Sequence, residues 1–112
     1  MRYVFLFLVW ITPAHAQEYV FYNYSQWEQL SETARLGYIA GAIDTLSSIA
    51  SAETIRAAKH YNTCVANAHM NLVQLDGNVR AYVRTKPALQ AHPMSFALLD
   101  YLVALCGPPP KQ

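Results

Sequence analysis

One long stretch with helical periodicity, residues 32–50, limits what this chain can fold into more than any other feature. Its apolar side chains recur at intervals of three and four residues, which places them on one face of an α-helix. These side chains are Leu36, Ile39, Ile43, Leu46 and Ile49. Because such a face must be buried against other elements, the sequence predicts a helical domain organised around this segment.

Two glycines, Gly37 and Gly41, lie one turn apart in this predicted helix. Each interior glycine costs about 1 kcal/mol relative to alanine, so two of them require a structural reason. We expect the apolar helix of residues 94–105 to pack closely on this bare strip. Asp44 follows three residues after Gly41, and we expect it to be a buried polar anchor with a hydrogen-bond partner. Gly37, Gly41 and Asp44 are therefore the predicted scaffold motif.

Residues 1–16 have the features of a cleaved secretory signal peptide. A positive charge at Arg2 precedes the apolar residues 3–11, and Ala14 and Ala16 supply the small residues of a cleavage site. The apolar run is too short to span a membrane, and an uncleaved anchor is the alternative. We therefore expect export, a periplasmic location and no membrane attachment after cleavage.

Cleavage would leave one small helical domain, residues 17–107, followed by a flexible tail, residues 108–112. A domain of this size gains much from a covalent staple. The chain has two cysteines, Cys64 and Cys106, and an even pair in an exported chain predicts a disulfide. Two separate buried thiols are the alternative.

A short helix is expected over residues 25–30, ahead of the long one. Ser25 and Glu28 have the spacing of a capping box, and Ser31 is a second N-cap candidate. A single continuous helix over residues 26–50 is the alternative. Either arrangement brings the helix start close to the aromatic N-terminal segment.

Further helices are expected over residues 52–61, 72–85 and 94–105. Asn71 caps the second of these, with Gln74 three residues later, and Gly107 ends the third. Residues 62–70 are expected to be a connection that carries Cys64. No run alternates as a strand does, so the predicted fold class is all-α: a small four-helix bundle-like domain stapled by one disulfide.

Residues 17–24 are dense in aromatic side chains and have no helical spacing, so an extended arm is expected there. The rings of Tyr19, Phe21, Tyr22 and Tyr24 would cover one end of the bundle. The alternative is a surface patch for a partner, because tyrosine is enriched at interfaces.

No residue pattern predicts catalysis or metal binding. His60, Cys64 and His69 loosely resemble a metal-binding set, but the spacings typical of such sites are absent. There is no nucleophile elbow, and the acidic residues are dispersed over structural positions. These are Glu28 in a cap, Asp44 in the strip, Asp76 in a first helical turn and Asp100 on a solvent face. We expect no enzyme activity, no metal and no cofactor.

Charge excludes some classes of partner. Without Arg2, seven Lys and Arg residues balance seven Asp and Glu residues, so nucleic acid and anionic membrane are not expected partners. Arg80, Arg84 and Lys86 form a basic end on one predicted helix. They either compensate the helix dipole or form one side of a protein interface that steers an acidic partner.

A series of motifs resembles the Rap/Tai family, the periplasmic immunity proteins for amidase effectors of type VI secretion. The series comprises W-x-x-L-S-x-x-x-R at residues 27–35, G-Y-I-A-G-A-I-D at residues 37–44, Q-L-x-x-x-V-R-A-Y-V-x-x-x-P at residues 74–87, and the two cysteines. On this resemblance Gly37, Gly41 and Asp44 match the family scaffold, and Cys64 and Cys106 match its staple. Many members carry a further cysteine pair, which this chain lacks.

The resemblance implies a small helical protein, often a homodimer, that binds a peptidoglycan amidase and blocks its active-site cleft without doing chemistry itself. Two other functions fit the sequence. One is a periplasmic chaperone of the acid-stress type, which would expose the apolar helix of residues 94–105 at low pH. The other is an exported helical domain with an unrelated protein partner.

Overall fold

The computed structural model describes residues 22–48 and 52–111 and confirms an all-α fold with one disulfide. The predicted signal peptide and residues 17–21 of the predicted arm lie outside the described residues. In chain order the elements are α1 (Tyr24–Glu28), α2 (Glu32–Ser48), α3 (Ala52–Asn67), α4 (Leu72–Thr85), the 3₁₀-helix η1 (Pro87–Ala91) and α5 (Met94–Cys106). No β-strand occurs in this part of the chain, and no helix there is long and apolar enough to cross a membrane.

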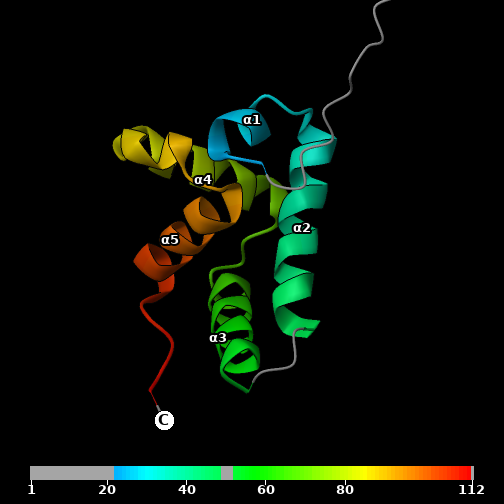
Figure 1. Ribbon diagram of the computed structural model, residues 1–112. Helices are drawn as coiled ribbons and strands as arrows, with labels where there is room; N and C mark the ends of the chain where they lie inside the picture. Colours follow the sequence, from blue (N-terminus) through cyan, green and yellow to red (C-terminus); the bar gives the residue numbers. More distant parts are fainter. Residues whose placement is uncertain (1–21, 49–51, 112) are drawn as a thin grey trace, which may run out of the picture.

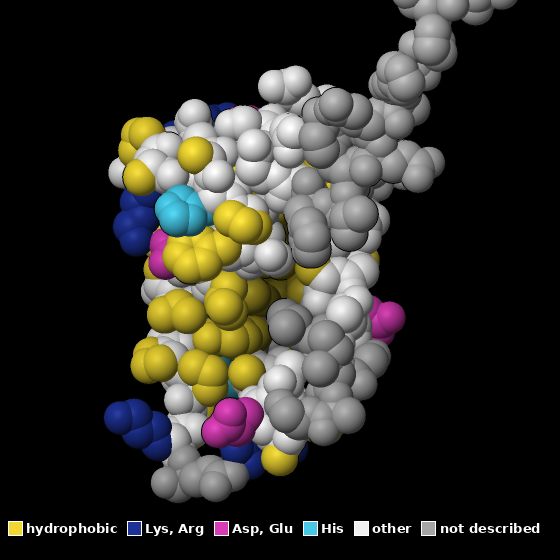
Figure 2. All heavy atoms as spheres, in the orientation of Figure 1, with side chains coloured by type: hydrophobic (Ala, Val, Ile, Leu, Met, Phe, Trp, Pro, Cys, Tyr) yellow, Lys and Arg dark blue, Asp and Glu magenta, His cyan; other side chains and the backbone are white. Residues whose placement is uncertain are grey.

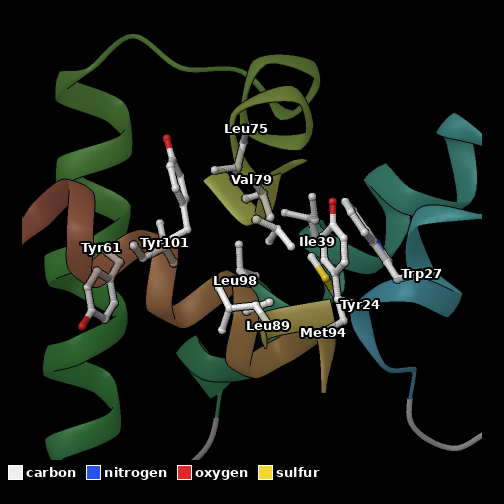
Figure 3. Close-up of a cluster of buried hydrophobic side chains, with 13 residues drawn as sticks. Tyr24, Trp27, Ile39, Tyr61, Leu75, Val79, Leu89, Met94, Leu98 and Tyr101 are labelled. Carbon is white, nitrogen blue, oxygen red and sulfur yellow. The ribbon is translucent and has the colours of Figure 1, made fainter. Parts of the chain in front are cut away.

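The helices differ in which neighbours they pack against, and Figure 1 shows their arrangement. The long helix α2 packs on α3 and on α4, whereas α5 packs on α3, on α4 and on α1. The largest fully buried side chains come from α1, α2, α4 and α5 and converge on one another (Figure 3). They include Tyr24, Trp27, Ile39, Leu75, Val79, Met94 and Leu98. The core therefore lies toward the α1 end of the molecule.

The start of α1 differs from the prediction. Asn23 is the N-cap: its Oδ1 accepts from the Gln26 backbone N–H at 2.8 Å, and Gln26 Oε1 accepts from the Asn23 N–H at 3.0 Å. Ser25 instead donates its hydroxyl to Gln90 O at 3.1 Å. The capping box predicted at Ser25 was wrong, because the helix already begins at Tyr24. Ser25 therefore lies inside the first turn and not at the N-cap.

The break between α1 and α2 confirms two helices rather than one. Ser31 caps α2, with its Oγ accepting from the Ala34 N–H at 3.3 Å. The predicted helix of residues 32–50 is observed to Ser48, and its last two residues lie outside the described chain.

The third helix is longer than the sequence predicted. Residues 62–67 continue α3, so Cys64 lies on a helix and not in a connection. No glycine or proline interrupts this stretch, and burial of Ala58 and Tyr61 holds the helix against the core. The helix ends at Asn67, and His69 in the following turn has a left-handed φ of 53°.

The fourth helix begins and ends where the sequence predicted. Asn71 and Gln74 form the reciprocal capping box at 2.8 and 2.9 Å, and the helix ends at Thr85, two residues before Pro87. Leu72, the first residue of this helix, is 39 % exposed, whereas Leu75, Val79 and Val83 are buried in the core.

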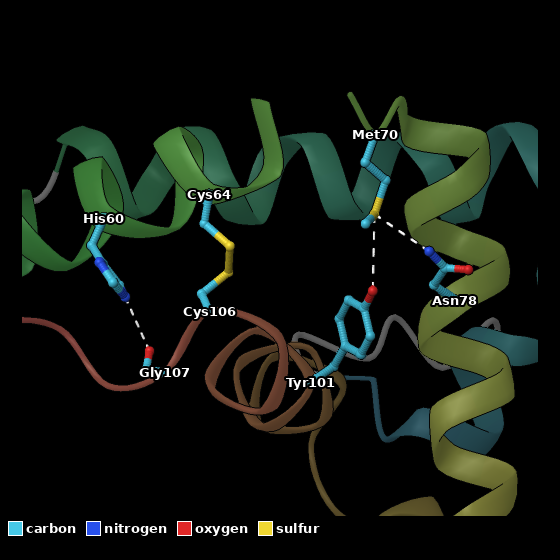
Figure 4. Close-up of a disulfide and its surroundings, with 7 residues drawn as sticks. All are labelled: His60, Cys64, Met70, Asn78, Tyr101, Cys106 and Gly107. Atoms are coloured by element: carbon cyan, nitrogen blue, oxygen red, sulfur yellow. Dashed lines mark hydrogen bonds between the residues drawn. A yellow bond between two sulfur atoms is a disulfide. The ribbon is translucent and has the colours of Figure 1, made fainter. Parts of the chain in front are cut away.

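The disulfide between Cys64 and Cys106 joins α3 to the end of α5 and confirms the predicted pairing (Figure 4). Gly107, with φ of 74°, ends α5 as predicted. Its carbonyl oxygen lies 3.0 Å from His60 Nε2, which therefore donates, since a carbonyl oxygen only accepts. Two side chains of α3 thus hold the end of α5.

Candidate functional site

An open groove of about 790 Å³ separates α2 from α5. Its α2 wall consists of Gly37, Tyr38, Gly41, Ala42 and Thr45, and its α5 side consists of Pro93, Ser95, Phe96, Leu98, Leu99 and Leu102. None of these side chains is charged. Hydrophobic side chains gather in this hollow in the space-filling view (Figure 2). A concave, mostly apolar surface of this size is typical of a binding site.

The glycine strip forms one wall of the groove instead of packing against a helix. No atom of the described chain lies within 4 Å of a Cβ built at Gly37 or Gly41, outside their own helix and neighbours. The predicted close packing of residues 94–105 on this strip was therefore wrong. The physical reason is that α5 packs on α3 and α4, and the disulfide holds its end at α3.

Asp44 is exposed and lies outside the groove lining, so the predicted buried polar anchor was also wrong. Successive residues of an α-helix are rotated by about 100°, because 3.6 residues make one turn. Asp44 is therefore about 60° around the helix from Gly41, in the direction opposite to Ala42 and Thr45, so it borders the α2 wall without lining it. Of the predicted scaffold motif, Gly37 and Gly41 line the groove and Asp44 does not.

An apolar row on α5 continues the groove onto the surface. Phe96, Leu99 and Val103 are 47 %, 42 % and 38 % exposed, and their spacing places them on one side of the helix. The opposite side of α5 is buried through Met94, Ala97, Leu98, Tyr101 and Leu102. The nearly all-apolar sequence of this helix therefore serves the core on one side and leaves a hydrophobic surface on the other.

The predicted basic end does not form one free patch. Arg80 Nη2 lies 2.9 Å from Asp76 Oδ2, and Lys86 Nζ lies 3.1 Å from Asp100 Oδ2. Only Arg84 of the three is exposed without an ion pair to the described chain. Two of the three cations thus already have carboxylate partners within the chain, and a role of the three in binding a partner stays a prediction.

Asp100 is half-buried rather than on a solvent face as predicted. The hydroxyl of Tyr82 donates to Asp100 Oδ2 at 2.7 Å, and Lys86 contacts the same oxygen. The hydrogen bond from Tyr82 and then that from Lys86 lower the pKa of the Asp100 carboxyl. This cluster joins the end of α4 to the exposed side of α5.

A buried ion-pair network was missed at the sequence level. Asp76 is 2 % exposed and is bound by Arg35, whose Nε lies 2.9 Å from Oδ1, and by Arg80. Arg35 also donates to Leu30 O at 2.7 Å and lies over the Trp27 ring at 5.9 Å. The hydrogen bond to Asp76 raises the pKa of Arg35. The spacing of Asp76 and Arg80, four residues apart, was the available sequence signal.

This network is structural in character. The carboxylate of Asp76 is enclosed by two guanidinium groups, and it fixes the start of α2 to α4. The sequence assigned Asp76 only to a first helical turn, whereas the structure places it between helices. Two partners compensate the desolvation of a buried charge, which one partner on the same helix would do incompletely.

The loosely metal-like set of His60, Cys64 and His69 does not converge. The sulfur of Cys64 is in the disulfide, and His60 bonds to Gly107 O. Among the described residues, no group of three or more His, Cys, Asp or Glu side chains could hold a metal ion.

A second hollow, of about 500 Å³, lies between α3 and the chain end. Arg56, Lys59 and Lys111 make it cationic, and Pro110 forms part of its wall. Its lining is more polar than that of the α2–α5 groove, and it lacks an adjoining row of exposed apolar side chains. The α2–α5 groove with the apolar row is therefore the stronger candidate site.

Comparisons with protein-family models, with curated proteins and with solved structures find no match for this chain.

Proposed function

We propose that this protein is an exported, non-catalytic binding protein that uses the α2–α5 groove and the apolar row of α5 to bind a protein partner. The observation that carries the proposal is the exposure of Phe96, Leu99 and Val103 beside an uncharged groove. Contiguous exposed apolar side chains of this kind typically mark interaction sites, because leaving them in water is unfavourable. Arg84, at the far end of α4, is a candidate rim charge.

The class of partner comes from the sequence motifs. Their resemblance to the Rap/Tai family makes a peptidoglycan amidase effector of type VI secretion the proposed partner, inhibited by occlusion of its active-site cleft. On this proposal the protein is periplasmic and contributes no catalytic group. Phe96 is the proposed anchor, since aromatic side chains at the centre of an interface dominate binding energy.

Calorimetric titration of the exported protein with amidases from the same genome tests this function. We expect Phe96→Ser and Leu99→Ser each to weaken the complex about tenfold, which corresponds to roughly 1.4 kcal/mol. Ala104→Ser is the matched control, because Ala104 is exposed on the same helix but outside the apolar row. An unchanged affinity of both variants, or no complex and no inhibition with any candidate amidase, contradicts the proposal.

The same apolar row also supports the alternative of an acid-stress chaperone, since such proteins bind unfolded clients through exposed hydrophobic surface. Light scattering of an aggregating client protein at pH 2 to 3 separates the two functions. A chaperone would suppress aggregation and lose this effect in Leu99→Ser, whereas an amidase inhibitor would show no suppression.

A homodimer, which the family resemblance implies, would cover the row with a second copy. Sedimentation velocity of the wild-type protein and of Leu99→Ser tests that arrangement. A dimer through the row becomes monomeric in the variant, while a dimer through another face stays intact.

A further inference from the structure

We propose that the hollow between α3 and the C-terminal tail binds an acidic peptide, at a site separate from the α2–α5 groove. The hollow has a volume of about 500 Å³, and its charged lining consists of Arg56, Lys59 and Lys111. No acidic side chain is among the described residues that line it. The inference does not depend on the proposed function, because it concerns another surface and another ligand.

Two contacts hold the start of the tail against α3. The disulfide joins Cys106 to Cys64, and His60 Nε2 donates to Gly107 O at 3.0 Å (Figure 4). From Gly107 the tail runs beside α3 toward the first turn of that helix (Figure 1). Lys111 is thereby placed across the hollow from the cations of α3.

The tail is a stiff wall. Residues 108–110 are three consecutive prolines, whose rings fix the backbone φ and limit the conformations that the tail can adopt. Pro109 is half-buried, and with Pro110 it lines an adjoining hollow opposite Ala57 of α3. A ligand would therefore meet a wall that is already in place, which reduces the entropy lost on binding.

The fold brings like charges together without pairing all of them. Neither Lys59 nor Lys111 forms a salt bridge to another described residue. Glu53 lines the adjoining hollow together with Arg56 and Lys111, so three cations share one neighbouring carboxylate. Cations held in one hollow repel one another, and an anionic ligand would relieve this repulsion.

The cations also suit carboxylates in particular. Arg56 is half-buried, and a guanidinium group can bind both oxygens of one carboxylate through two parallel hydrogen bonds. Lys59 and Lys111 are exposed and carry their charges on flexible side chains, which can follow further carboxylates. The lining is therefore suited to several carboxylates rather than to one.

The length of the lining favours a peptide over a small anion. Its α3 side extends from Arg56 to Asn67, which is about 16 Å along a helix that rises 1.5 Å per residue. Lys59 and Thr63 lie on the same side of the helix between them. An extended peptide of about five residues has this length.

The two halves of the lining offer different groups to such a peptide. The cations occupy the half toward the start of α3, where they can bind acidic side chains. Thr63 and Asn67 occupy the other half, and their side chains can donate to and accept from a peptide backbone. A small anion would use only the cationic half.

Titration followed by amide chemical shifts of the exported protein tests the site without any natural partner. The probe is a terminally blocked tri-glutamate peptide at low ionic strength, where charge interactions are least screened. A blocked tri-glutamine peptide tests the need for charge, and citrate tests whether a small anion of similar charge binds as well. We expect the tri-glutamate shifts to gather around Arg56, Lys59, Thr63 and Lys111.

We expect Lys59→Gln and Lys111→Gln each to weaken tri-glutamate binding about threefold, and the double variant about tenfold. The control is Lys86→Gln, because Lys86 is also an exposed lysine but lies outside the hollow. It lowers the net charge equally, and we expect it to leave the affinity unchanged. The spectrum of each variant verifies that the fold persists.

Four outcomes would overturn the proposal. Absence of tri-glutamate binding would remove the site, and equal binding of tri-glutamine would remove the role of charge. Equal weakening by Lys86→Gln and Lys59→Gln would reduce the effect to non-specific attraction. Citrate that binds as tightly as tri-glutamate would make the hollow a site for small anions and not for a peptide.

Discussion

At the residue scale, two buried polar groups differ in how they are compensated. Asp76 has two guanidinium partners, while the Tyr24 hydroxyl has no hydrogen-bond partner among the described residues. Tyr24 packs on Trp27, with ring centroids 5.6 Å apart, and Asp76 binds Arg35, which lies over the same Trp27 ring. Removing the charge of Asp76 is therefore expected to lower the free energy of unfolding, whereas removing the Tyr24 hydroxyl is not.

Asp76→Asn is expected to lower the free energy of unfolding by about 3–5 kcal/mol, because it leaves two half-buried guanidinium groups without their buried counter-charge. Urea denaturation followed by circular dichroism measures this loss. Asp100→Asn is the control: its partner Lys86 is 54 % exposed, so a loss of about 1 kcal/mol or less is expected. Equal losses in the two variants would contradict the structural role given to Asp76.

Tyr24→Phe is expected to keep or raise stability at neutral pH, by up to about 1 kcal/mol, because it removes an unpaired buried hydroxyl. Burial, assisted by Glu28, raises the pKa of Tyr24 to about 12. An unfolded tyrosine titrates near pH 10, so the folded state is the one that resists deprotonation and stability falls as the pH rises above about 10.

Urea denaturation between pH 9 and 11 checks this dependence. Tyr24→Phe is expected to lose stability less steeply than the wild type over this range. Burial also raises the pKa values of Tyr38 and Tyr61, so some dependence remains in the variant. A variant as steep as the wild type would show that Tyr24 ionises as easily in the folded state as in the unfolded one.

At the element scale, the groove depends on which helices α5 packs against. Packing on α3 and α4 leaves the glycine side of α2 open, although glycines at this spacing are typical of close helix contacts. The extension of α3 to Asn67 has the same effect, since it places Cys64 on a rigid helix that holds the end of α5. Because α3 holds α5 in this position, it also determines where the α2–α5 groove lies.

Gly41→Leu is expected to change the free energy of unfolding by less than about 1 kcal/mol, because the new side chain meets open space and gains helix propensity. Ala97→Leu is the matched control, with the same side chain added at a fully buried position, where overpacking costs about 1–3 kcal/mol. Thermal and urea denaturation measure both. A larger loss at Gly41 than at Ala97 would place a packed helix on the strip after all.

At the scale of the whole molecule, one covalent bond holds a small fold together. The disulfide closes a loop with a sequence separation of 42 and links α3 to the last turn of α5. The apolar row lies on α5, which also forms one side of the groove, so the disulfide that stabilises the domain also fixes one side of the candidate site. Reduction is therefore expected to affect stability and binding together.

Replacing both cysteines by serine is expected to lower the free energy of unfolding by about 4 kcal/mol, from the loop-closure entropy restored to the unfolded chain. Urea denaturation of the double variant, and of the wild type with and without reductant, measures this. The reduced wild type should match the double variant. A loss below about 1 kcal/mol would show that non-covalent packing alone holds α5.

The sequence by itself determined the elements whose signals are local. Four helix ends depend on neighbouring residues alone, and the sequence predicted each of them. They are the cap at Asn71, the break at Ser31, the end of α4 before Pro87 and the end of α5 at Gly107. The cysteine pair was also found, because two cysteines allow one pairing. The amidase partner and the signal peptide stay predictions.

Only the tertiary structure decided which faces meet. The apolar sequence of α5 is nearly uniform around the helix, so its pattern did not show which side faces the core and which forms the exposed row. The glycines of α2 permit close packing but do not require it, and α5 packs elsewhere. The partners of Asp76 come partly from another helix, and a carboxylate carries no local sign of a cation 41 residues away. Helix starts and stops depend on bonds between near neighbours, whereas grooves and ion pairs depend on distances between segments that the chain folds together.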